Sequence, residues 1–373
     1  MNFRPVLYVI GLLLSVLAIS MTFPMLVDLH TGHPDWKVFF LCAIVTSFFG
    51  GMLILTNTSS KITISIREGF LLTSLSWITL CLFAALPFWF SELEMTFPDA
   101  VFEAVSGITT TGATVIAGLD EAPPGLLLWR ALLQWLGGIG IIVMALSLMP
   151  FLNIGGMQLF RTESSENEKA LPRAAQLATS IFVIYLGFTF ICTVCYIVAG
   201  FNTFNAVAHA LTTISTGGFS TYDTSFSAHD DMAKEFVAII FMICGALPFV
   251  LYLKAFQGNW GVLIKDMQIK WFFGILGSAI SILLLWRYLY GAPDFLETLI
   301  HVTFSATSVM TGTGYSNTDY GVWRNFPVAI FFFLMVVGGC AGSTTCGIKI
   351  FRFQVLYAVT VTQIRQLLNP HGV

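Results

Sequence analysis

The sequence predicts an all-helical membrane protein that crosses the bilayer several times. Of its 373 residues, 56% are hydrophobic and only 10% are charged, whereas a soluble domain carries about 25% charged residues. A membrane-spanning helix needs about 20 apolar residues, and eight apolar segments reach or approach that length. Three further apolar segments hold only about 12 to 16 residues, which is too few to cross, so they predict re-entrant helices.

These segments can be placed along the chain. The first apolar run resembles a signal peptide, but it continues to about Val27 without a convincing cleavage site, so we expect a retained first span. The last run is too long for one span and is interrupted by the glycine-rich stretch 338–349. The expected spans lie near 5–27, 36–55, 70–90, 126–149, 175–199, 236–253, 271–290 and 325–362, and the expected re-entrant helices at 98–110, 204–215 and 296–311.

Charge asymmetry predicts the orientation, because cytoplasmic loops carry an excess of Lys and Arg. With a cytoplasmic N-terminus and re-entrant short segments, the loops 56–69, 150–174 and 254–270 are cytoplasmic, and most acidic residues fall outside. If the short segments crossed, the basic loops would lie on the wrong faces of the membrane. The cytoplasmic set would hold 12 of the 17 basic residues, namely Arg4, Lys61, Arg67, Arg161, Lys169, Arg173, Lys254, Lys265, Lys270, Lys349, Arg352 and Arg365.

Several classes of function are disfavoured by composition. The net charge of −3 and the lack of a basic patch make nucleic-acid binding unlikely. Five of the seven cysteines lie inside apolar runs, which is not the pattern of a disulfide framework. No metal-ligand spacing, nucleophile–base pair or phosphate-binding loop is visible, so we expect no enzyme and no cofactor. For the loop pair His30 and His33, beside Asp28 and Asp35, weak metal binding is an alternative to simple solvation, which we favour.

A repeated unit is visible in the sequence. Residues 98–115 align with 300–317 at a shift of 202, and Thr216–Gly217 in 204–220 matches Thr111–Gly112 at a shift of 105. Each copy consists of a helix, a re-entrant helix, a Thr/Ser–Gly loop and a second helix. The predicted organisation is an N-terminal hairpin over 1–69 and pore repeats over 70–160, 161–265 and 266–373, the last with a broken second helix.

Such a unit is suited to an ion pore. Non-helical backbone at membrane depth must line protein or water, and a ring of carbonyl oxygens can replace the hydration shell of a monovalent cation. Glycine leaves such a pore open, and the key positions are Gly112, Gly217 and Gly314. The alternative is that these small residues only help helices to pack, but three copies in the same context favour a filter.

The motifs TTTGATV at 109–115, ISTGGFS at 214–220 and MTGTGYS at 310–316 carry a family resemblance, together with LQWLGGIGI at 133–141 and GGCAGSTTCGIK at 338–349. The chain resembles the membrane subunit of the bacterial Trk/Ktr potassium uptake systems, of the TrkH/TrkG type. The resemblance implies four repeats around one central pore in the bacterial inner membrane, a homodimer, and a cytoplasmic nucleotide-binding regulatory subunit similar to TrkA. The implied potassium-binding residues are Thr110, Thr111, Gly112, Ser215, Thr216, Gly217, Gly312, Thr313 and Gly314.

In one respect the chain departs from that family. No fourth repeat follows residue 362. We therefore expect a fragment or a truncated product, or a ring that a second chain completes.

The glycine-rich stretch 338–347 predicts an interruption of the last helix. The resemblance implies a loop below the filter that blocks the pore and moves to let ions pass; the alternative is a packing kink. Lys349 and Arg352 follow the loop and either contact a partner or anchor the helix at the interface. The gate residues would be Gly338, Gly339, Gly342, Ser343, Thr344, Thr345 and Gly347.

A few ionisable residues lie within or near the apolar segments. Glu103, His209 and His301 are either functional groups or, as we favour, braces behind the filter backbone. Arg130 and Arg287 are expected to reach the membrane interface with their long side chains.

Potassium permeation through a filter is the function that these features favour. The alternative is an ion-coupled secondary transporter with a midplane cation site, which predicts inverted repeats and intramembrane carboxylates. Glu103 is the one acid clearly placed in a membrane segment, and the repeats keep one orientation. Whether flux is coupled to another ion, as in symport, is left open.

Overall fold

The computed structural model describes residues 3–58, 65–152, 170–228, 231–290 and 294–368. Within these ranges the chain consists of helices and loops, apart from one isolated β-bridge between Val337 and Ile348. The predicted all-helical class is therefore confirmed. Lys61, Arg161 and Lys169, three of the predicted cytoplasmic charges, lie outside the described residues.

Close packing divides the chain into two compact units. The first contains residues 1–178, 207–212 and 219–223, and the second contains 179–206, 213–218 and 224–373. The four-part division into a hairpin and three repeats stays a prediction.

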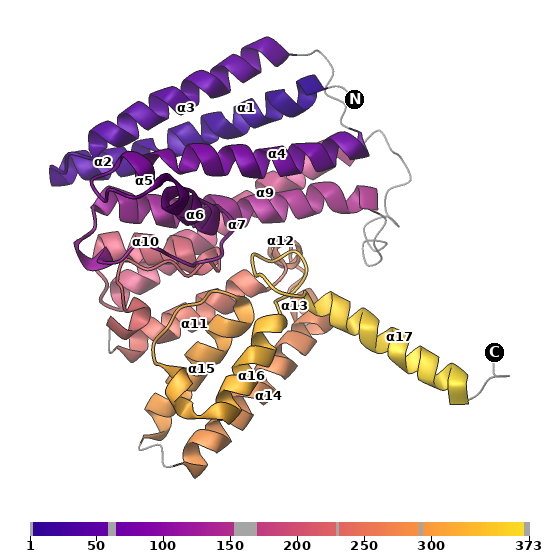
Figure 1. Ribbon diagram of the computed structural model, residues 1–373. Helices are drawn as coiled ribbons and strands as arrows, with labels where there is room; N and C mark the ends of the chain where they lie inside the picture. Colours follow the sequence, from indigo (N-terminus) through magenta and orange to yellow (C-terminus); the bar gives the residue numbers. More distant parts are fainter. Residues whose placement is uncertain (1–2, 59–64, 153–169, 229–230, 291–293, 369–373) are drawn as a thin grey trace. The chain divides into compact units, whose positions relative to one another are not determined.

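The first unit begins with α1 (Phe3–Ser20), α2 (Thr22–Thr31) and α3 (Trp36–Asn57). The helices α1 and α3 lie side by side (Figure 1) and cross at Gly11 and Gly50. A Cβ on Gly11 would lie 2.8 Å from the Gly50 carbonyl oxygen, so only glycine permits this approach.

The rest of the first unit builds the surroundings of the first motif. It contains α4 (Ile66–Ala84), α5 (Leu86–Phe90), α6 (Phe97–Ile108) and α7 (Pro124–Leu152). In its core the Trp129 indole packs edge-on against Phe39 and donates a hydrogen bond of 3.0 Å to the Ala84 carbonyl, at the break between α4 and α5.

Three short helices occupy the positions predicted for re-entrant segments. They are α6, α10 (Thr203–Ile214) and α15 (Phe295–Thr311), and each agrees with its predicted range within two residues. The 12 residues of α6 and of α10 rise only ~18 Å, and the 17 residues of α15 rise about 26 Å, against a hydrocarbon core of ~30 Å.

Several described helices are long and apolar enough to cross a membrane. Two of them, α9 (Ala170–Val198) and α14 (Met267–Leu289), directly precede the short helices α10 and α15. With several such helices, the chain is a multi-pass membrane protein. The five candidate spans are Phe3–Thr31, Trp36–Asn57, Arg67–Phe90, Gln176–Val198 and Met267–Leu289.

The expected single span 236–253 is wrong in one respect, because it is sharply bent. The chain forms α11 (Met232–Ala246) and α12 (Phe249–Phe256), and the two helices make an angle of 93°. Pro248 at the break has no amide hydrogen, and Leu247 before it is extended. The short helix α13 (Gly261–Lys265) follows.

The last apolar run is broken as predicted. It consists of α16 (Asn325–Val336) and α17 (Ile350–Leu368), with a non-helical loop between them. Figure 1 shows α17, in yellow, leading to the C-terminus. It packs on α14 through the rings of Trp271 and Tyr357, whose centres are 5.6 Å apart. Three short 3-10 helices complete the described elements at Leu119–Glu121, Ser225–Ala228 and Tyr320–Trp323.

Candidate cation site

The three Thr/Ser–Gly motifs share one backbone conformation. Each motif contains a stretch of three residues, 110–112, 216–218 or 312–314, in which the first and third positions have positive φ and the residue between them does not. A side-chain-bearing residue in this region costs about 1–2 kcal/mol, so the two threonines among them are held there by their surroundings. The angles are 55° and 80° at Thr110 and Gly112, 50° and 81° at Thr216 and Gly218, and 73° and 81° at Gly312 and Gly314.

These angles correct the register of the second motif. The spacings are 106 (216 − 110) and 96 (312 − 216), so Gly218 corresponds to Gly112. The sequence match at a shift of 105 instead pairs Gly217 with Gly112. That match aligns the Thr–Gly dipeptides of the two motifs. In the structure, however, the residue with the left-handed conformation of Gly112 is Gly218, the second glycine of the pair Gly217–Gly218. Turn hydrogen bonds follow the same register: Thr110 N to Gly107 O, Thr216 N to Thr213 O, and Gly312 N to Val309 O.

Each motif directly follows the C-terminal end of a short helix, where carbonyl groups carry partial negative charge. The hydroxyl of Thr110 donates to the Thr109 carbonyl at 2.7 Å, and Thr216 donates to Ser215 O at 2.8 Å. The hydroxyls of Thr311 and Thr313 are also hydrogen-bonded, at 2.7 Å. These contacts fix the threonine side chains of the motifs.

A side chain in each short helix braces the far end of its motif or the residue just after it. The Glu103 carboxylate accepts hydrogen bonds from the Thr114 hydroxyl at 3.0 Å and from the Val115 amide at 3.1 Å. The His209 imidazole pairs with the Ser220 hydroxyl at 3.0 Å. Glu103 and His209 therefore make the contacts expected of side chains that support the backbone of the motifs.

The third brace is Ser305, not His301. The Ser305 hydroxyl donates to the Asn317 side-chain oxygen at 2.9 Å, whereas His301 lies 3.7 Å from a Glu235 carboxylate oxygen. The sequence shift of 202 pairs Glu103 with Ser305. Its hydroxyl is uncharged, so Ser305 does not stand out in the sequence as an ionisable residue in an apolar segment does.

Arg130, predicted to reach the membrane interface, lies inside the protein instead, whereas the interfacial position of Arg287 stays a prediction. Arg130 is 1% exposed, and its Nε is 2.7 Å from the Glu103 carboxylate. A buried carboxylate partner therefore holds this arginine inside the protein. The guanidinium of Arg287 is 4.9 Å from the centre of the Trp323 ring and packs over it.

Two glycines let long helices approach the ends of the short ones. A Cβ on Gly137 of α7 would lie 1.9 Å from the Ile108 carbonyl oxygen, and one on Gly245 of α11 would lie 2.9 Å from Ile214 O. In the second unit, a Cβ on Gly218 would lie 1.7 Å from the Thr313 carbonyl oxygen. The second and third motifs are therefore in direct backbone contact.

The loop between α16 and α17 is closed at its base and touches the second motif at its tip. Gly338 donates to Ile348 O at 3.0 Å beside the β-bridge, which draws the two ends of the loop together. The Thr344 hydroxyl lies 3.2 Å from Ile214 O and accepts a hydrogen bond of 3.1 Å from the Thr216 hydroxyl. The predicted interruption therefore adjoins a predicted filter residue.

The same loop supplies partners to the bend between α11 and α12. The Cys340 amide donates to Ala246 O at 3.1 Å, and the Thr344 amide donates to Gly245 O at 3.2 Å. These carbonyls would otherwise lack helical partners because Pro248 interrupts the hydrogen-bond ladder. Pro248 is the sequence feature that could have indicated this contact.

Lys349 makes contacts within the loop that the sequence did not predict. Its Nζ donates to the Thr345 carbonyl, and lies 3.0 Å from the Thr345 hydroxyl and 3.5 Å from that of Ser343. Lys349 therefore holds the loop from within. Arg352 is exposed, so both alternatives remain open for it.

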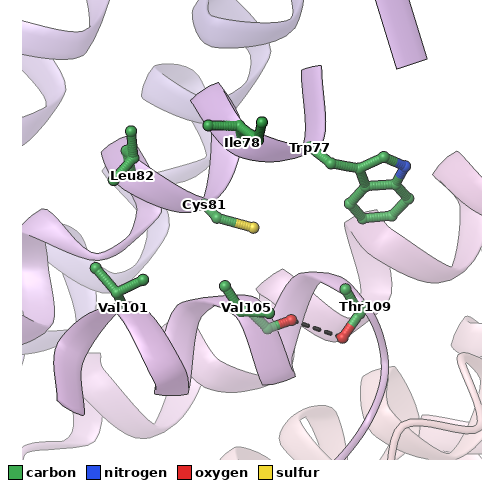
Figure 2. Close-up of a pocket in the computed structure, with 7 residues that line it drawn as sticks. All are labelled: Trp77, Ile78, Cys81, Leu82, Val101, Val105 and Thr109. Atoms are coloured by element: carbon green, nitrogen blue, oxygen red, sulfur yellow. Dashed lines mark hydrogen bonds between the residues drawn. The ribbon is translucent and has the colours of Figure 1, made fainter. Parts of the chain in front are cut away.

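A groove between α4 and α6 is apolar. Its volume is about 330 Å³, and Figure 2 shows the α6 residues facing those of α4. Thr109 carries the one side-chain oxygen in its lining, and that hydroxyl donates to the Val105 carbonyl at 2.7 Å. The groove therefore lacks the oxygen ligands that a cation needs. Its lining residues are Trp77, Ile78, Cys81, Leu82, Val101, Val105 and Thr109.

The acidic and histidine residues near the first loop make local contacts. His33 lies 3.7 Å from the Glu92 carboxylate, and Asp28 accepts a hydrogen bond of 2.6 Å from the Gly125 amide. Burial raises the pKa of Asp35, while a hydrogen bond from the Glu92 amide opposes this shift. Among the described residues no group of three or more His, Cys, Asp or Glu could hold a metal ion.

Comparison with known proteins agrees with this architecture. The family model for TrkH, described as a cation transport protein, matches residues 36–373. TrkI of Halomonas elongata, a Trk system potassium uptake protein, is 40% identical over 100% of this chain and 76% of its own length. TrkG of Escherichia coli, named likewise, is 34% identical over 99% of this chain and 77% of its own length.

A solved structure shows the same fold. The crystal structure of the potassium transporter TrkH from Vibrio parahaemolyticus matches with a TM-score of 0.92 and 33% identity. The match covers 100% of this chain and 78% of that one. Relatives and structure together identify a transport protein rather than an enzyme, and the chain belongs to the TrkH family.

Proposed function

We propose that this protein takes up potassium ions across the bacterial inner membrane through a filter lined by backbone carbonyl oxygens. The single observation that carries the proposal is the backbone conformation shared by the three motifs, each directly after a short helix. The relatives that match over the whole chain are named potassium uptake proteins, which supports the choice of ion.

The chemistry of the motifs suits a potassium ion. Backbone that alternates between positive and negative φ can turn successive carbonyl groups to one side, which an extended strand cannot do. Such oxygens can replace the hydration shell of potassium. The proposed ligands are those named by the resemblance, with Gly218 added by the register of the second motif: Thr110, Thr111, Gly112, Ser215, Thr216, Gly217, Gly218, Gly312, Thr313 and Gly314.

The loop over 338–347 is the proposed gate. Its support is the hydrogen bond between Thr344 and Thr216, which ties the loop to the first residue of positive φ in the second motif. A loop in this position could occlude the path of an ion that leaves the filter.

Orientation and assembly complete the proposal. The N-terminus is cytoplasmic, the protein is a homodimer, and a cytoplasmic nucleotide-binding subunit similar to TrkA regulates it. Four pore repeats would surround one central path, as the family resemblance implies. No cofactor is needed, because potassium is the permeating ligand.

The ion-coupled secondary transporter is the weaker alternative. It needs an intramembrane carboxylate that can exchange its partner during transport. Glu103 is instead paired with Arg130 at 2.7 Å and with two groups of the following loop. Its charge is therefore committed to a fixed contact.

Ion selectivity tests the filter. In cells that lack other potassium uptake systems, the full-length protein should take up rubidium in clear preference to sodium. Gly112→Ser places a side chain at a position with a φ of 80°. We expect the rubidium-to-sodium uptake ratio to fall by about tenfold, which corresponds to ~1.4 kcal/mol of discrimination.

The matched control is Gly258→Ser in the loop after α12. Gly258 also has a positive φ, 101°, and nothing lies within 4 Å of its Cβ position. This variant should keep the wild-type ratio. Equal ratios in wild type, Gly112→Ser and Gly314→Ser would remove the motifs from the filter.

Cysteine labelling tests the orientation. A cysteine at position 228, in the loop before α11, should react with an impermeant reagent added outside intact cells. A cysteine at position 165, in the basic loop 150–174, should react after the cells are opened. The measurement is the extent of labelling at each position in a background where the native cysteines remain unreactive. Labelling of position 165 alone in intact cells would invert the proposed orientation.

A further inference from the structure

Arg130 and Glu103 form a deeply buried ion pair in the first unit. Arg130 is 1% exposed and Glu103 is completely buried, and their Nε and Oε1 atoms are 2.7 Å apart. Arg130 lies in α7 and Glu103 in the short helix α6. Charged residues at membrane depth are costly, so a pair in this place is a candidate for function.

Both oxygens of the Glu103 carboxylate are directed at the end of the first motif. Oε1 also accepts from the Thr114 hydroxyl at 3.0 Å, and Oε2 accepts from that hydroxyl at 3.0 Å and from the Val115 amide at 3.1 Å. The α6 helix anchors the other end of the motif at Thr109. Residues 110–113 are therefore held between two fixed points.

The remaining face of Arg130 holds a second stretch of backbone. Its Nη1 donates to the Ser220 carbonyl at 2.9 Å, and the guanidinium lies 4.0 Å from the centre of the Phe219 ring. One turn further along α7, the Gln134 side-chain oxygen accepts from the Phe219 amide at 3.0 Å. In the sequence, Phe219 and Ser220 directly follow the glycines of the second motif.

This geometry is more specific than stability requires. A buried ion pair seldom stabilises a fold more than apolar residues of similar volume would. Here both oxygens of Glu103 and the Nη1 of Arg130 also contact the far end of a motif, in addition to the bond between the two partners. An arginine can make these contacts at once, because its planar guanidinium presents several donors in a fixed geometry.

We propose that Arg130 and Glu103 are positioning residues that set the spacing of the filter backbone, so that discrimination between potassium and sodium depends on the pair. This inference rests on the proposed function. Sodium is the smaller ion, and a filter excludes it only while its carbonyls are kept from closing around it. The clamp on 114–115 and on 219–220 opposes that relaxation.

The test compares three variants of the full-length protein in cells that lack other potassium uptake systems. They are Glu103→Gln, Arg130→Gln and the double variant, and the readout is the rubidium-to-sodium uptake ratio at equal amounts of inserted protein. We expect each single variant to lower the ratio at least tenfold. We expect the double variant to be no worse than the poorer single variant, because both act on one contact. Arg130→Lys keeps the charge without the planar geometry and should give an intermediate ratio.

Insertion into the membrane is checked by size-exclusion profiles of the solubilised protein. The double variant leaves no unpaired buried charge, so it keeps the inference testable even where a single variant does not insert. The matched control is Asp28→Asn, since Asp28 is also buried and hydrogen-bonds the start of the same helix, at Gly125. It should retain the wild-type ratio even if it lowers the amount of protein.

The outcomes separate the inference from the proposed function. A wild-type protein without preference for rubidium would overturn the proposed function itself. A selective wild type together with an inserted double variant of equal selectivity would overturn the inference alone. A reduced amount of protein with an unchanged ratio would likewise show that the pair serves only stability.

Discussion

Gly218→Ala is expected to abolish potassium uptake. A Cβ on Gly218 would lie 1.7 Å from the Thr313 carbonyl oxygen, and the φ of 81° is itself unfavourable for alanine. The conformational strain alone is about 1–2 kcal/mol, but the overlap with backbone cannot be relieved by rotating a side chain. The second and third motifs would have to separate. The measurement is rubidium uptake, normalised to inserted protein, in cells without other potassium uptake systems.

Gly314→Ala separates strain from overlap. Gly314 has the same φ of 81°, yet nothing lies within 4 Å of its Cβ position. This variant should lose part of its uptake, whereas Gly218→Ala should lose all of it. If both variants behaved alike, the close contact between the two motifs would not be needed for transport.

Removal of residues 340–345 from the gate loop is expected to raise rubidium uptake several-fold. The base of the loop is closed by the bridge between Val337 and Ile348, and a Cβ on Gly338 would lie 2.0 Å from Cys346 O. The two ends of the deletion are therefore close enough to rejoin. The deletion takes away Thr344 and its contact with Thr216, so the proposed obstruction below the filter is lost. Uptake is measured with and without the regulatory subunit, on which it should depend less.

A point variant serves as the matched comparison. Thr344→Val removes only the hydroxyl that contacts Thr216 and Ile214, and a smaller rise in uptake is expected, while Thr344→Ser should behave like wild type. The potassium preference should persist in each. An inserted deletion variant without increased uptake would favour the packing kink over the gate, and a loss of preference would place the loop within the filter.

Helix positions were the most predictable part of this fold. The short apolar segments at 98–110, 204–215 and 296–311 had the length of re-entrant helices, and the structure has helices there. Apolar length is a local property, so a single sequence reveals it. The bend at Pro248 was missed because the hydropathy of 236–253 is continuous across the proline.

Side-chain partners were less predictable. Arg130 looked like an interfacial residue because its partner, Glu103, is 27 positions away in the chain. The register of the second motif was off by one, since identity favours Gly217 and conformation favours Gly218. Ser305 was missed because its role depends on what lies opposite it, at Asn317, and not on its own chemistry.

Movement of the loop that adjoins the bend at Pro248 requires water to enter the space that the loop leaves. The carbonyls of Gly245 and Ala246 receive their hydrogen bonds from the amides of Thr344 and Cys340. When the loop moves as proposed, four polar groups lose their partners at membrane depth, and each buried group left unpaired costs about 1–3 kcal/mol. Water must therefore enter as the loop leaves. Without water, the cost of the unpaired groups would oppose movement of the loop. With water present, a potassium ion that leaves the filter can regain its hydration shell there.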